Sequence, residues 1–223
     1  VYYDNASGHE GLYQYLQAAT MLLFGPSAWG VRGPSILLGT LAVLLSYLLF
    51  RRLFGWQAAL TAAFLLTVSF WSLLYSRTGQ RHISVTVTTL ASFLCLWRAV
   101  ARSSTVGVPR MSGAGWYALA GVLMGLGFYT YFASRGVPLI PLAWLAYLYI
   151  WQREQFRRCW RGVLIACGIA LLMAVPLILT LRAQPEAETR VAELATPVYD
   201  ARAGDFSTLL EYTGVTLSMF THD

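Results

Sequence analysis

The sequence has no lysine, and acidic residues are missing from its long apolar stretches. All sixteen basic residues are arginines, and the ten Asp and Glu residues lie between or outside six apolar runs. The three cysteines are not spaced like zinc ligands, and neither a Walker loop nor a glycine-rich dinucleotide turn occurs. Cys95 and Cys167 lie within long apolar runs, so no two cysteines lie outside these runs where they could form a disulfide. These absences argue against a nucleotide-binding fold, a structural zinc site and a domain held by disulfides.

The six apolar runs are the dominant feature of what is present. Each is close to the length that crosses a hydrocarbon core about 30 Å thick at about 1.5 Å per helical residue. The runs are Gly33–Phe50, Gln57–Tyr75, Ile83–Ala99, Gly115–Phe132, Gly136–Trp151 and Gly162–Leu181. The sequence therefore predicts an all-α fold, a polytopic membrane bundle of about six transmembrane helices.

The arginines divide unequally between alternate gaps in this series. The gaps after the first, third and fifth runs, together with Arg98 at the end of the third run, hold nine arginines and one acidic residue, Glu154, whereas the remaining segments hold seven arginines and nine acids. Arginine-rich short loops lie on the cytoplasmic side of a membrane. Both ends of the chain are therefore predicted to lie outside, and the net charge of +6 reflects topology and gives no support for a nucleic-acid partner.

The predicted organisation is one membrane domain over residues 1–223, cut from a longer protein at both ends because it opens on Val1 without a signal segment. Residues 1–32 form an outer loop with an interfacial helix, 33–181 the six spans and 182–223 an outer loop. The interfacial helix is expected over Glu10–Phe24, where leucines recur on one helical face. Short helices are expected at Glu186–Leu194 and Phe206–Phe220.

Polar residues gather at the predicted outer ends of the spans. Arg77 and Arg81 are spaced i,i+4, so they share a face if the second span continues as a helix, and Tyr131 and Arg135 have the same spacing. Two guanidiniums on one face can bind a phosphate through bidentate, charge-assisted hydrogen bonds. The alternative is that these side chains anchor the helices at the membrane interface. His82 is a candidate base, metal ligand or helix-start hydrogen-bonding group, and Glu10 a candidate helix cap.

The order of several short segments resembles the GT-C membrane glycosyltransferases. The similarity is to the bacterial branch of the dolichyl-phosphate-mannose protein mannosyltransferase and aminoarabinose transferase superfamily. The segments that carry it are His9–Ala18, Phe24–Ser35, Tyr47–Gly55, Phe70–Trp71, Ser76–Arg81, Gly127–Tyr131, Arg135–Leu139 and Met219–Asp223. Their order along nearly the whole chain carries the resemblance.

This resemblance implies a GT-C-like fold in a bacterial plasma membrane. It implies inverting transfer of a sugar from a polyprenyl-phosphate donor to a protein, lipid or glycan acceptor at the outer face. The family's catalytic Asp is expected upstream of Val1, so the chain alone is expected to be inactive. Many relatives have Lys-Pro-Pro-Leu where this sequence has His9–Leu12, and several have an Asp where it has His82–Ser84. A lysine role is therefore not carried over, and a divalent metal requirement is left open.

The resemblance also suggests roles for the outer polar residues. Glu10 is given an auxiliary acid/base or sugar-hydroxyl role, and the leaving phosphate is assigned to Arg77, Arg81 and Arg135, because fixed cations stabilise charge that grows in the transition state. Further substrate contacts are assigned to His9, His82, Tyr129 and Tyr131. Arg77→Ala is expected to lower turnover at least about tenfold. A lipid transporter or flippase, with its polar site near the midplane, and a non-catalytic scaffold stay as alternatives.

Overall fold

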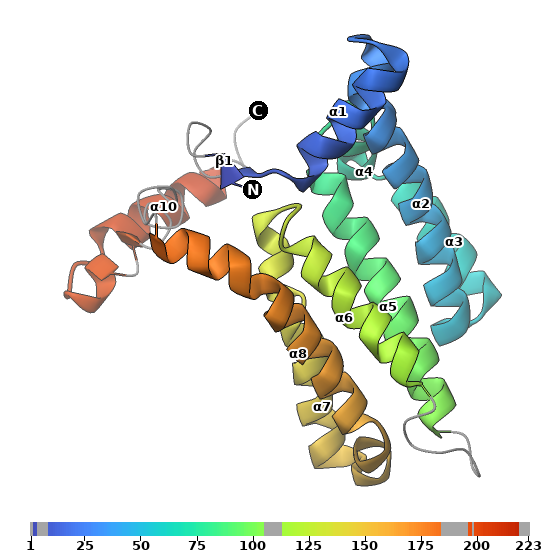
Figure 1. The fold of residues 1–223 in the computed structure, drawn as a ribbon. Helices are drawn as coiled ribbons and strands as arrows, with labels where there is room; N and C mark the ends of the chain where they lie inside the picture. Colours follow the sequence, from blue (N-terminus) through green and yellow to red (C-terminus); the bar gives the residue numbers. More distant parts are fainter. Residues whose placement is uncertain (1, 4–8, 105–112, 184–195, 198, 219–223) are drawn as a thin grey trace. The chain divides into compact units, whose positions relative to one another are not determined.

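The structure is a computed structural model, and it describes residues 2–3, 9–104, 113–183, 196–197 and 199–218. These residues belong to two compact units, one covering residues 10–178 and the other residues 2–9 and 179–223. The first unit is a bundle of helices, in agreement with the predicted all-α membrane fold (Figure 1). The predicted boundaries at residues 32 and 181 stay predictions.

The described elements follow in chain order. The helices are α1 (Leu12–Phe24), α2 (Ala28–Phe54), α3 (Trp56–Val68), α4 (Phe70–Arg77), α5 (His82–Ser104), α6 (Ala114–Gly127), the 3₁₀ helix η2 (Phe132–Gly136), α7 (Leu139–Trp151), α8 (Arg153–Ala183) and α10 (Ser207–Ser218). Two strands of two residues each, β1 (Tyr2–Tyr3) and β2 (His9–Glu10), precede α1.

Helix α5 is the centre of the first unit. It packs against α2 on one side and α6 on the other, and α2 also contacts α1, α3 and α4 (Figure 1). A glycine seam joins α6 to α8, because a Cβ at Gly121 would lie 2.5 Å from the Ala166 carbonyl oxygen and one at Gly162 would overlap the Tyr117 ring. Small residues let the backbones of membrane helices approach closely. The core of the unit therefore lies along α5 and this seam.

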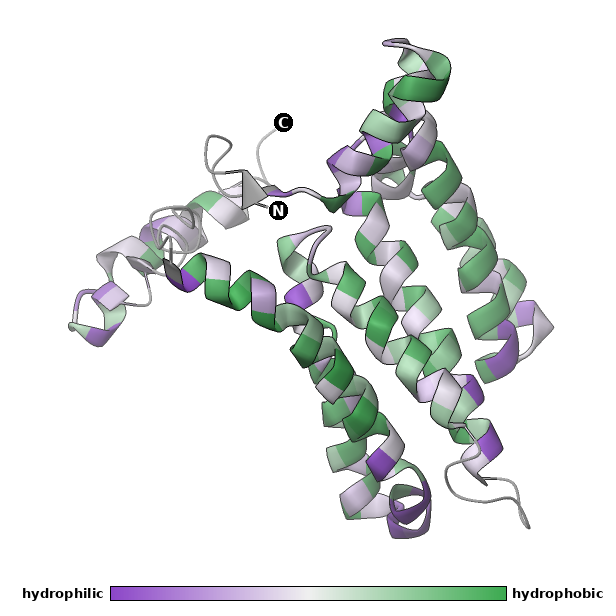
Figure 2. Cartoon of the chain, viewed as in Figure 1, coloured by the Kyte–Doolittle hydropathy of each residue, from purple (hydrophilic) through white to green (hydrophobic). Residues whose placement is uncertain are grey.

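Among the helices that the structure describes, only some reach the length needed to span a membrane. By length and composition α2, α5 and α8 are long and apolar enough to cross a membrane, and α3 with α4 would make a fourth span bent by 59°. Large apolar side chains such as Leu37, Phe64 and Leu172 are exposed along these helices. Hydrophobic residues cover their middle parts, while hydrophilic residues collect toward their ends (Figure 2). This is the surface expected of a polytopic membrane bundle.

Two predicted spans are shorter than their apolar runs. α6 has 14 residues and α7 has 13, which corresponds to about 20 Å each. The run Gly115–Phe132 is not one helix, because α6 ends at Gly127 and the chain turns before it enters η2. Six full crossings therefore stay a prediction for these two segments.

Helix α1 confirms the predicted helix, and it ends at Gly25 as the sequence indicated. Its buried face is the polar one: Tyr13 is 1% exposed and hydrogen-bonds Ser35 of α2, whereas Leu22 and Leu23 are exposed. Burial raises the pKa of the Tyr13 phenol above its ordinary value. The polar side of α1 thus holds it to the bundle, and its apolar side is exposed, so an interfacial position stays a prediction.

In the second unit, α10 confirms the helix predicted at Phe206–Phe220. Asp205 accepts a hydrogen bond of 2.9 Å from the Ser207 backbone amide at the start of α10. The hydrogen bonds from Ser207 lower the pKa of the Asp205 carboxyl. The helix expected at Glu186–Leu194 lies outside the described residues.

Candidate functional site

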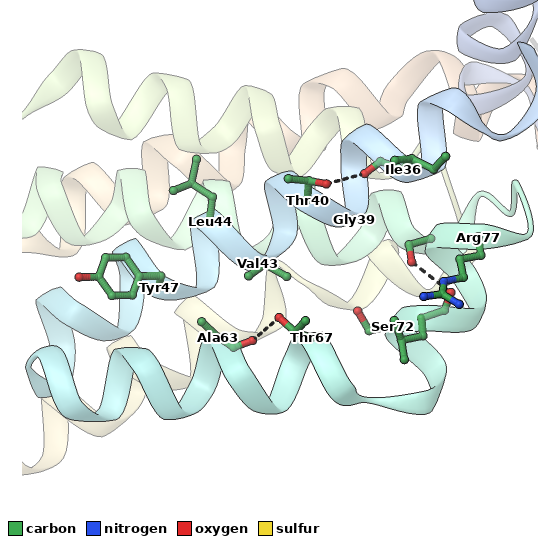
Figure 3. A pocket seen from close by; sticks show the side chains of 12 residues that line it. Ile36, Gly39, Thr40, Val43, Leu44, Tyr47, Ala63, Thr67, Ser72 and Arg77 are labelled. Carbon is green, nitrogen blue, oxygen red and sulfur yellow. Dashed lines mark hydrogen bonds between the residues drawn. The ribbon is translucent and has the colours of Figure 1, made fainter. Parts of the chain in front are cut away.

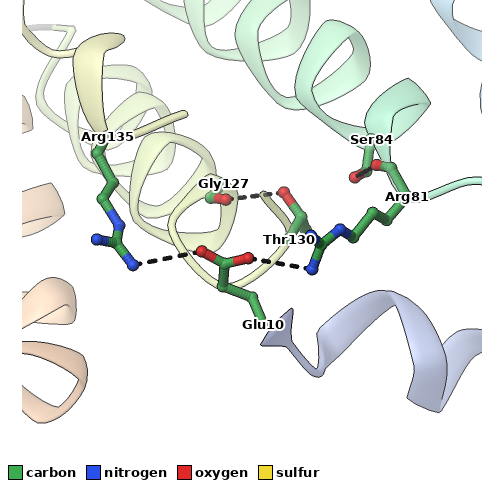
Figure 4. A network of polar contacts seen from close by, with 6 residues as sticks. All are labelled: Glu10, Arg81, Ser84, Gly127, Thr130 and Arg135. Atoms are coloured by element: carbon green, nitrogen blue, oxygen red, sulfur yellow. Dashed lines mark hydrogen bonds and ion pairs between the residues drawn. The ribbon is translucent and has the colours of Figure 1, made fainter. Parts of the chain in front are cut away.

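Three charged residues that are far apart in the sequence meet at one end of the bundle. The Glu10 Oε2 atom accepts a hydrogen bond from Arg81 Nη1 at 3.3 Å, and its Oε1 atom accepts one from Arg135 Nη2 at 3.3 Å (Figure 4). Glu10 is only 2% exposed. One buried carboxylate therefore bridges two guanidiniums, and we call Glu10, Arg81 and Arg135 the Glu10 cluster.

Glu10 is positioned by the start of α1. It lies two residues before the helix, and the Leu12 backbone amide donates to the Tyr129 carbonyl oxygen at 3.2 Å. This bond joins the chain before α1 to the segment that follows α6. The carboxylate is thus held between the connections that carry the two arginines.

Arg81 is positioned by a tight turn between α4 and α5. Gly79 has a φ of +75°, a conformation that side chains with a Cβ rarely adopt, and a Cβ there would lie 3.2 Å from the Val31 carbonyl oxygen. Gln17 of α1 holds the turn, because its Nε2 atom donates to the carbonyl oxygens of Val31 and Gly79, each at 3.0 Å. The Ser84 hydroxyl donates to the Arg81 carbonyl oxygen. These bonds direct the Arg81 side chain toward Glu10.

Arg135 is positioned by the sharp exit from α6. The Thr130 hydroxyl donates to the Gly127 carbonyl oxygen at 2.7 Å, and Tyr131 is extended with a φ of −161° before η2 begins. A Cβ at Gly127 would lie 3.1 Å from Ser134 Cβ, so the turn packs closely on η2. The 3₁₀ helix η2 then carries Arg135 to the carboxylate.

Aromatic rings line the Arg81 side of the cluster. The Arg81 guanidinium carbon lies 5.3 Å from the centre of the Tyr131 ring. His82 lies between two tyrosines, with ring centres 4.8 Å from Tyr75 and 4.4 Å from Tyr131. Cation–π contact and stacking hold these planar groups against one another. The structure therefore brings Tyr131 and His82, both predicted substrate contacts, next to the cluster.

The other predicted substrate contacts are placed differently. The Tyr129 hydroxyl donates to the Met173 carbonyl oxygen of α8, which ties the segment after α6 to α8. His9 lies in β2, and its side chain is outside the described part of the structure. Tyr129 is thus used in packing.

Arg77 does not join the cluster. It is the last residue of α4, its side chain is exposed, and it lies against α2 and α3. The prediction that Arg77 and Arg81 share a helical face is wrong, because α4 ends at Arg77 and the Gly79 turn separates the two residues. Tyr131 and Arg135, which have the same spacing, lie beyond the end of α6.

The cluster carries two positive charges against one negative charge. Charge-assisted hydrogen bonds from guanidinium to an oxyanion are strong and directional, so a second anion such as a phosphate could share the two arginines. In this structure each Glu10 oxygen accepts one guanidinium hydrogen bond and keeps a second lone pair that could accept from a substrate group. Among the residues that the structure describes, no three His, Cys, Asp or Glu side chains form a group that could hold a metal ion.

The sequence that forms this site matches a known protein family. Residues 11–180 match the family described as dolichyl-phosphate-mannose-protein mannosyltransferase. The match begins one residue after Glu10 and contains both arginines of the cluster. No solved structure matches the chain significantly.

The chain is also similar to curated bacterial proteins. It is 32% identical over 177 residues to the undecaprenyl phosphate-alpha-4-amino-4-deoxy-L-arabinose arabinosyl transferase of Pseudomonas paraeruginosa, which covers 76% of this chain and 30% of that protein. It is 35% identical over 164 residues to the second such transferase of Pseudomonas fluorescens, covering 70% of this chain and 26% of that protein. The chain therefore spans about a third of the length of the relatives it matches.

Proposed function

The chain belongs to the dolichyl-phosphate-mannose-protein mannosyltransferase family, and from that premise we propose that it is part of a glycosyltransferase that uses a polyprenyl-phosphate-linked sugar. The names of its relatives, which are undecaprenyl-phosphate aminoarabinose transferases, support this donor class. The sugar is transferred at the outer face of a bacterial plasma membrane to a protein, lipid or glycan. The convergence of Arg81 and Arg135 on one buried carboxylate carries the proposal.

Arg81 and Arg135 bind the donor phosphate in this proposal. As the bond between the anomeric carbon and the phosphate oxygen breaks, negative charge grows on the phosphate, and fixed guanidiniums stabilise that charge more in the transition state than in the ground state. An acceptor hydroxyl oxygen attacks the anomeric carbon from the opposite side, which inverts it, while a carboxylate base takes the hydroxyl proton and the polyprenyl phosphate leaves. Tyr131 and His82 lie beside Arg81, and because their ring faces pack against Arg81, Tyr75 and each other, a sugar would meet the polar edges of these rings.

Glu10 holds the two arginines at a fixed separation in this proposal. A carboxylate that bridges both guanidiniums fixes their direction before the donor binds, so less ordering is required at the reaction. When a phosphate takes over part of these hydrogen bonds, a freed Glu10 oxygen can accept from a sugar hydroxyl. This combines positioning with the auxiliary role suggested by the sequence.

A test compares arginine variants in the full-length protein reconstituted in liposomes. Arg81→Ala and Arg135→Ala should each lower kcat/KM for sugar transfer from a synthetic polyprenyl-phosphate sugar by about 100-fold, the effect of removing one donor that faces transition-state charge. Arg32→Ala, an exposed arginine near the start of α2, is the matched control and should change it less than about twofold. Undiminished transfer by both cluster variants would falsify the phosphate assignment.

The bend between α3 and α4 gives the transporter alternative one supporting observation, because broken helices form the sites of many transporters. However, the break at Ser69 lies between Val68 and Phe70, and no charged residue flanks it. Following the donor in the same liposomes separates the two functions. A glycosyltransferase releases polyprenyl phosphate from the donor, whereas a transporter moves the donor across the bilayer intact.

A further inference from the structure

A long groove runs between α2 and the bent pair α3–α4. It has a volume of about 750 Å³, and its walls include Thr40, Val43 and Tyr47 of α2, Ala63 and Thr67 of α3, and Arg77 of α4 (Figure 3). We call it the α2–α4 groove. Tyr47 lies toward one end and Arg77 toward the other.

The walls of this groove are suited to hydrocarbon. Most of the lining surface is apolar, although polar groups are carried by Thr40, Tyr47, Thr67, Ser72, Ser76 and Arg77. The two threonine hydroxyls donate within their own helices, Thr40 to the Ile36 carbonyl oxygen at 2.9 Å and Thr67 to that of Ala63 at 2.7 Å, and the Ser76 hydroxyl donates to the Leu73 carbonyl oxygen at 3.1 Å. Exposed Leu37 and Phe64 lie on the same two helices. In a membrane, a hollow in such a face is filled by a lipid chain, because water there would find few hydrogen-bonding partners.

The length of the groove indicates which kind of lipid chain it can hold. It follows α2 from Ile36 to Tyr47, which is about 16 Å at 1.5 Å per residue. This is about half of a hydrocarbon core about 30 Å thick, the depth of one leaflet. An acyl chain of one leaflet matches that depth, whereas a long polyprenyl chain would extend well past the groove.

Arg77 supplies a charged end to the groove. Its exposed guanidinium lies where α4 ends, and α4 is held firmly there because a Cβ at Gly39 would lie 2.6 Å from Ser76 Cβ. A guanidinium beside an apolar groove can bind a lipid phosphate while the attached chain lies along the helices. This pairing of a cation with a hydrocarbon groove matches the two parts of a phospholipid.

We propose that the α2–α4 groove is a binding site for an anionic phospholipid, with one acyl chain in the groove and the phosphate on Arg77. The site is distinct from the Glu10 cluster, since none of the cluster's residues lines it. It does not depend on the sugar-transfer reaction, because no donor is required to form it.

Native mass spectrometry of the full-length protein tests this proposal. The protein is released from nanodiscs that contain phosphatidylcholine and phosphatidylglycerol, and bound phosphatidylglycerol is measured. One molecule should stay on the wild type. Arg77→Gln should raise its apparent Kd about tenfold, as expected for a lost charge-assisted hydrogen bond. Thr67→Phe should fill the groove and produce a similar loss, while Arg77→Lys should retain more lipid than Arg77→Gln.

Matched controls lie outside the groove. Arg32→Gln removes another exposed arginine, and Leu65→Phe adds bulk on another part of α3, so both should retain phosphatidylglycerol like the wild type. The proposal is overturned if Arg77→Gln and Thr67→Phe also retain it fully, or if equimolar undecaprenyl phosphate displaces it from the wild type. Phosphatidylglycerol retention is measured without sugar donor, so a negative result leaves the transferase proposal unaffected. A negative result in the sugar-transfer assay likewise leaves the lipid-site proposal unaffected.

Discussion

The Glu10 cluster and the α2–α4 groove each have an arginine near the end of an apolar helix. They differ in what surrounds the guanidinium. In the cluster, two guanidiniums share a carboxylate whose side chain is 3% exposed, and the Arg81 side chain is itself only 11% exposed. At the groove, Arg77 is exposed beside an apolar wall. Only three residues separate Arg77 from Arg81 in the sequence, yet their surroundings differ in burial and in charge.

This difference indicates what each site is suited to bind. A buried pair of guanidiniums held by a carboxylate is fixed before a ligand arrives, which favours stabilisation of charge during a reaction. A single exposed arginine can follow a mobile lipid phosphate but imposes little orientation on it. The comparison therefore predicts a catalytic effect for changes in the cluster and an effect on lipid binding for changes at Arg77. Arg77→Ala is accordingly expected to reduce turnover less than Arg81→Ala.

The largest effect on stability is expected from Glu10→Gln. The substitution removes the charge that both arginines contact, so two close positive charges lose their shared compensation, and breaking a buried ion pair costs about 3 kcal/mol or more. The thermal unfolding midpoint in detergent should fall by about 6 °C or more. Glu154→Gln is the control, because Glu154 is exposed at the start of α8. Equal midpoints for the two variants would show that the ion pairs of the Glu10 cluster do not stabilise the fold.

Gly79→Ala should separate the two sites most clearly. A Cβ at a φ of +75° and 3.2 Å from the Val31 carbonyl oxygen strains the turn, at a cost of about 2 kcal/mol. Arg81 should move away from Glu10, so sugar transfer should fall about tenfold, whereas phosphatidylglycerol retention at Arg77 should not change. Gly115→Ala is the control, since a Cβ there meets nothing within 4 Å. A parallel loss of both properties would contradict the division into two sites.

Gln17→Met should have the smallest effect. It removes the two hydrogen bonds to the Val31 and Gly79 carbonyl oxygens while keeping the length of the side chain, and should lower the free energy of unfolding by about 1 kcal/mol. Transfer should fall a few-fold because the Gly79 turn is held less firmly, and lipid retention at Arg77 should be maintained. Gln57→Met, at an exposed position in α3, serves as the control for both measurements. If Gln57→Met lowers the free energy of unfolding as much as Gln17→Met does, the hydrogen bonds of Gln17 do not stabilise the turn.

Much of the fold could be predicted from the sequence because apolar length and turn residues act locally. The run Gly33–Phe50 lies inside α2, and Gly25 ends α1 as expected. The leucines of α1 were expected on one helical face, away from its polar residues. That the polar side would be the buried one could not be predicted, because Tyr13 and Gln17 find their partners on α2 and in the Gly79 turn.

The sequence indicated the residues of the Glu10 cluster, but it did not indicate which outer polar residues lie close together. The sequence indicated Glu10, Arg81 and Arg135 as outer polar residues, and helical spacing then wrongly grouped Arg77 with Arg81. The signal against that grouping was Thr78-Gly79, a turn-forming pair directly after Arg77. The bend at Ser69 had a weaker signal, since serine is tolerated within membrane helices.

The sequence by itself determined that this protein is a helical membrane bundle with arginines at its helix ends, because hydrophobic length and charge bias are properties of single segments. Only the tertiary structure decided which arginines act together. Glu10 meets Arg81 across 71 residues and Arg135 across 125. Such pairs depend on where each helix stops and turns, and the packing of α1, α5 and α6 fixes those positions.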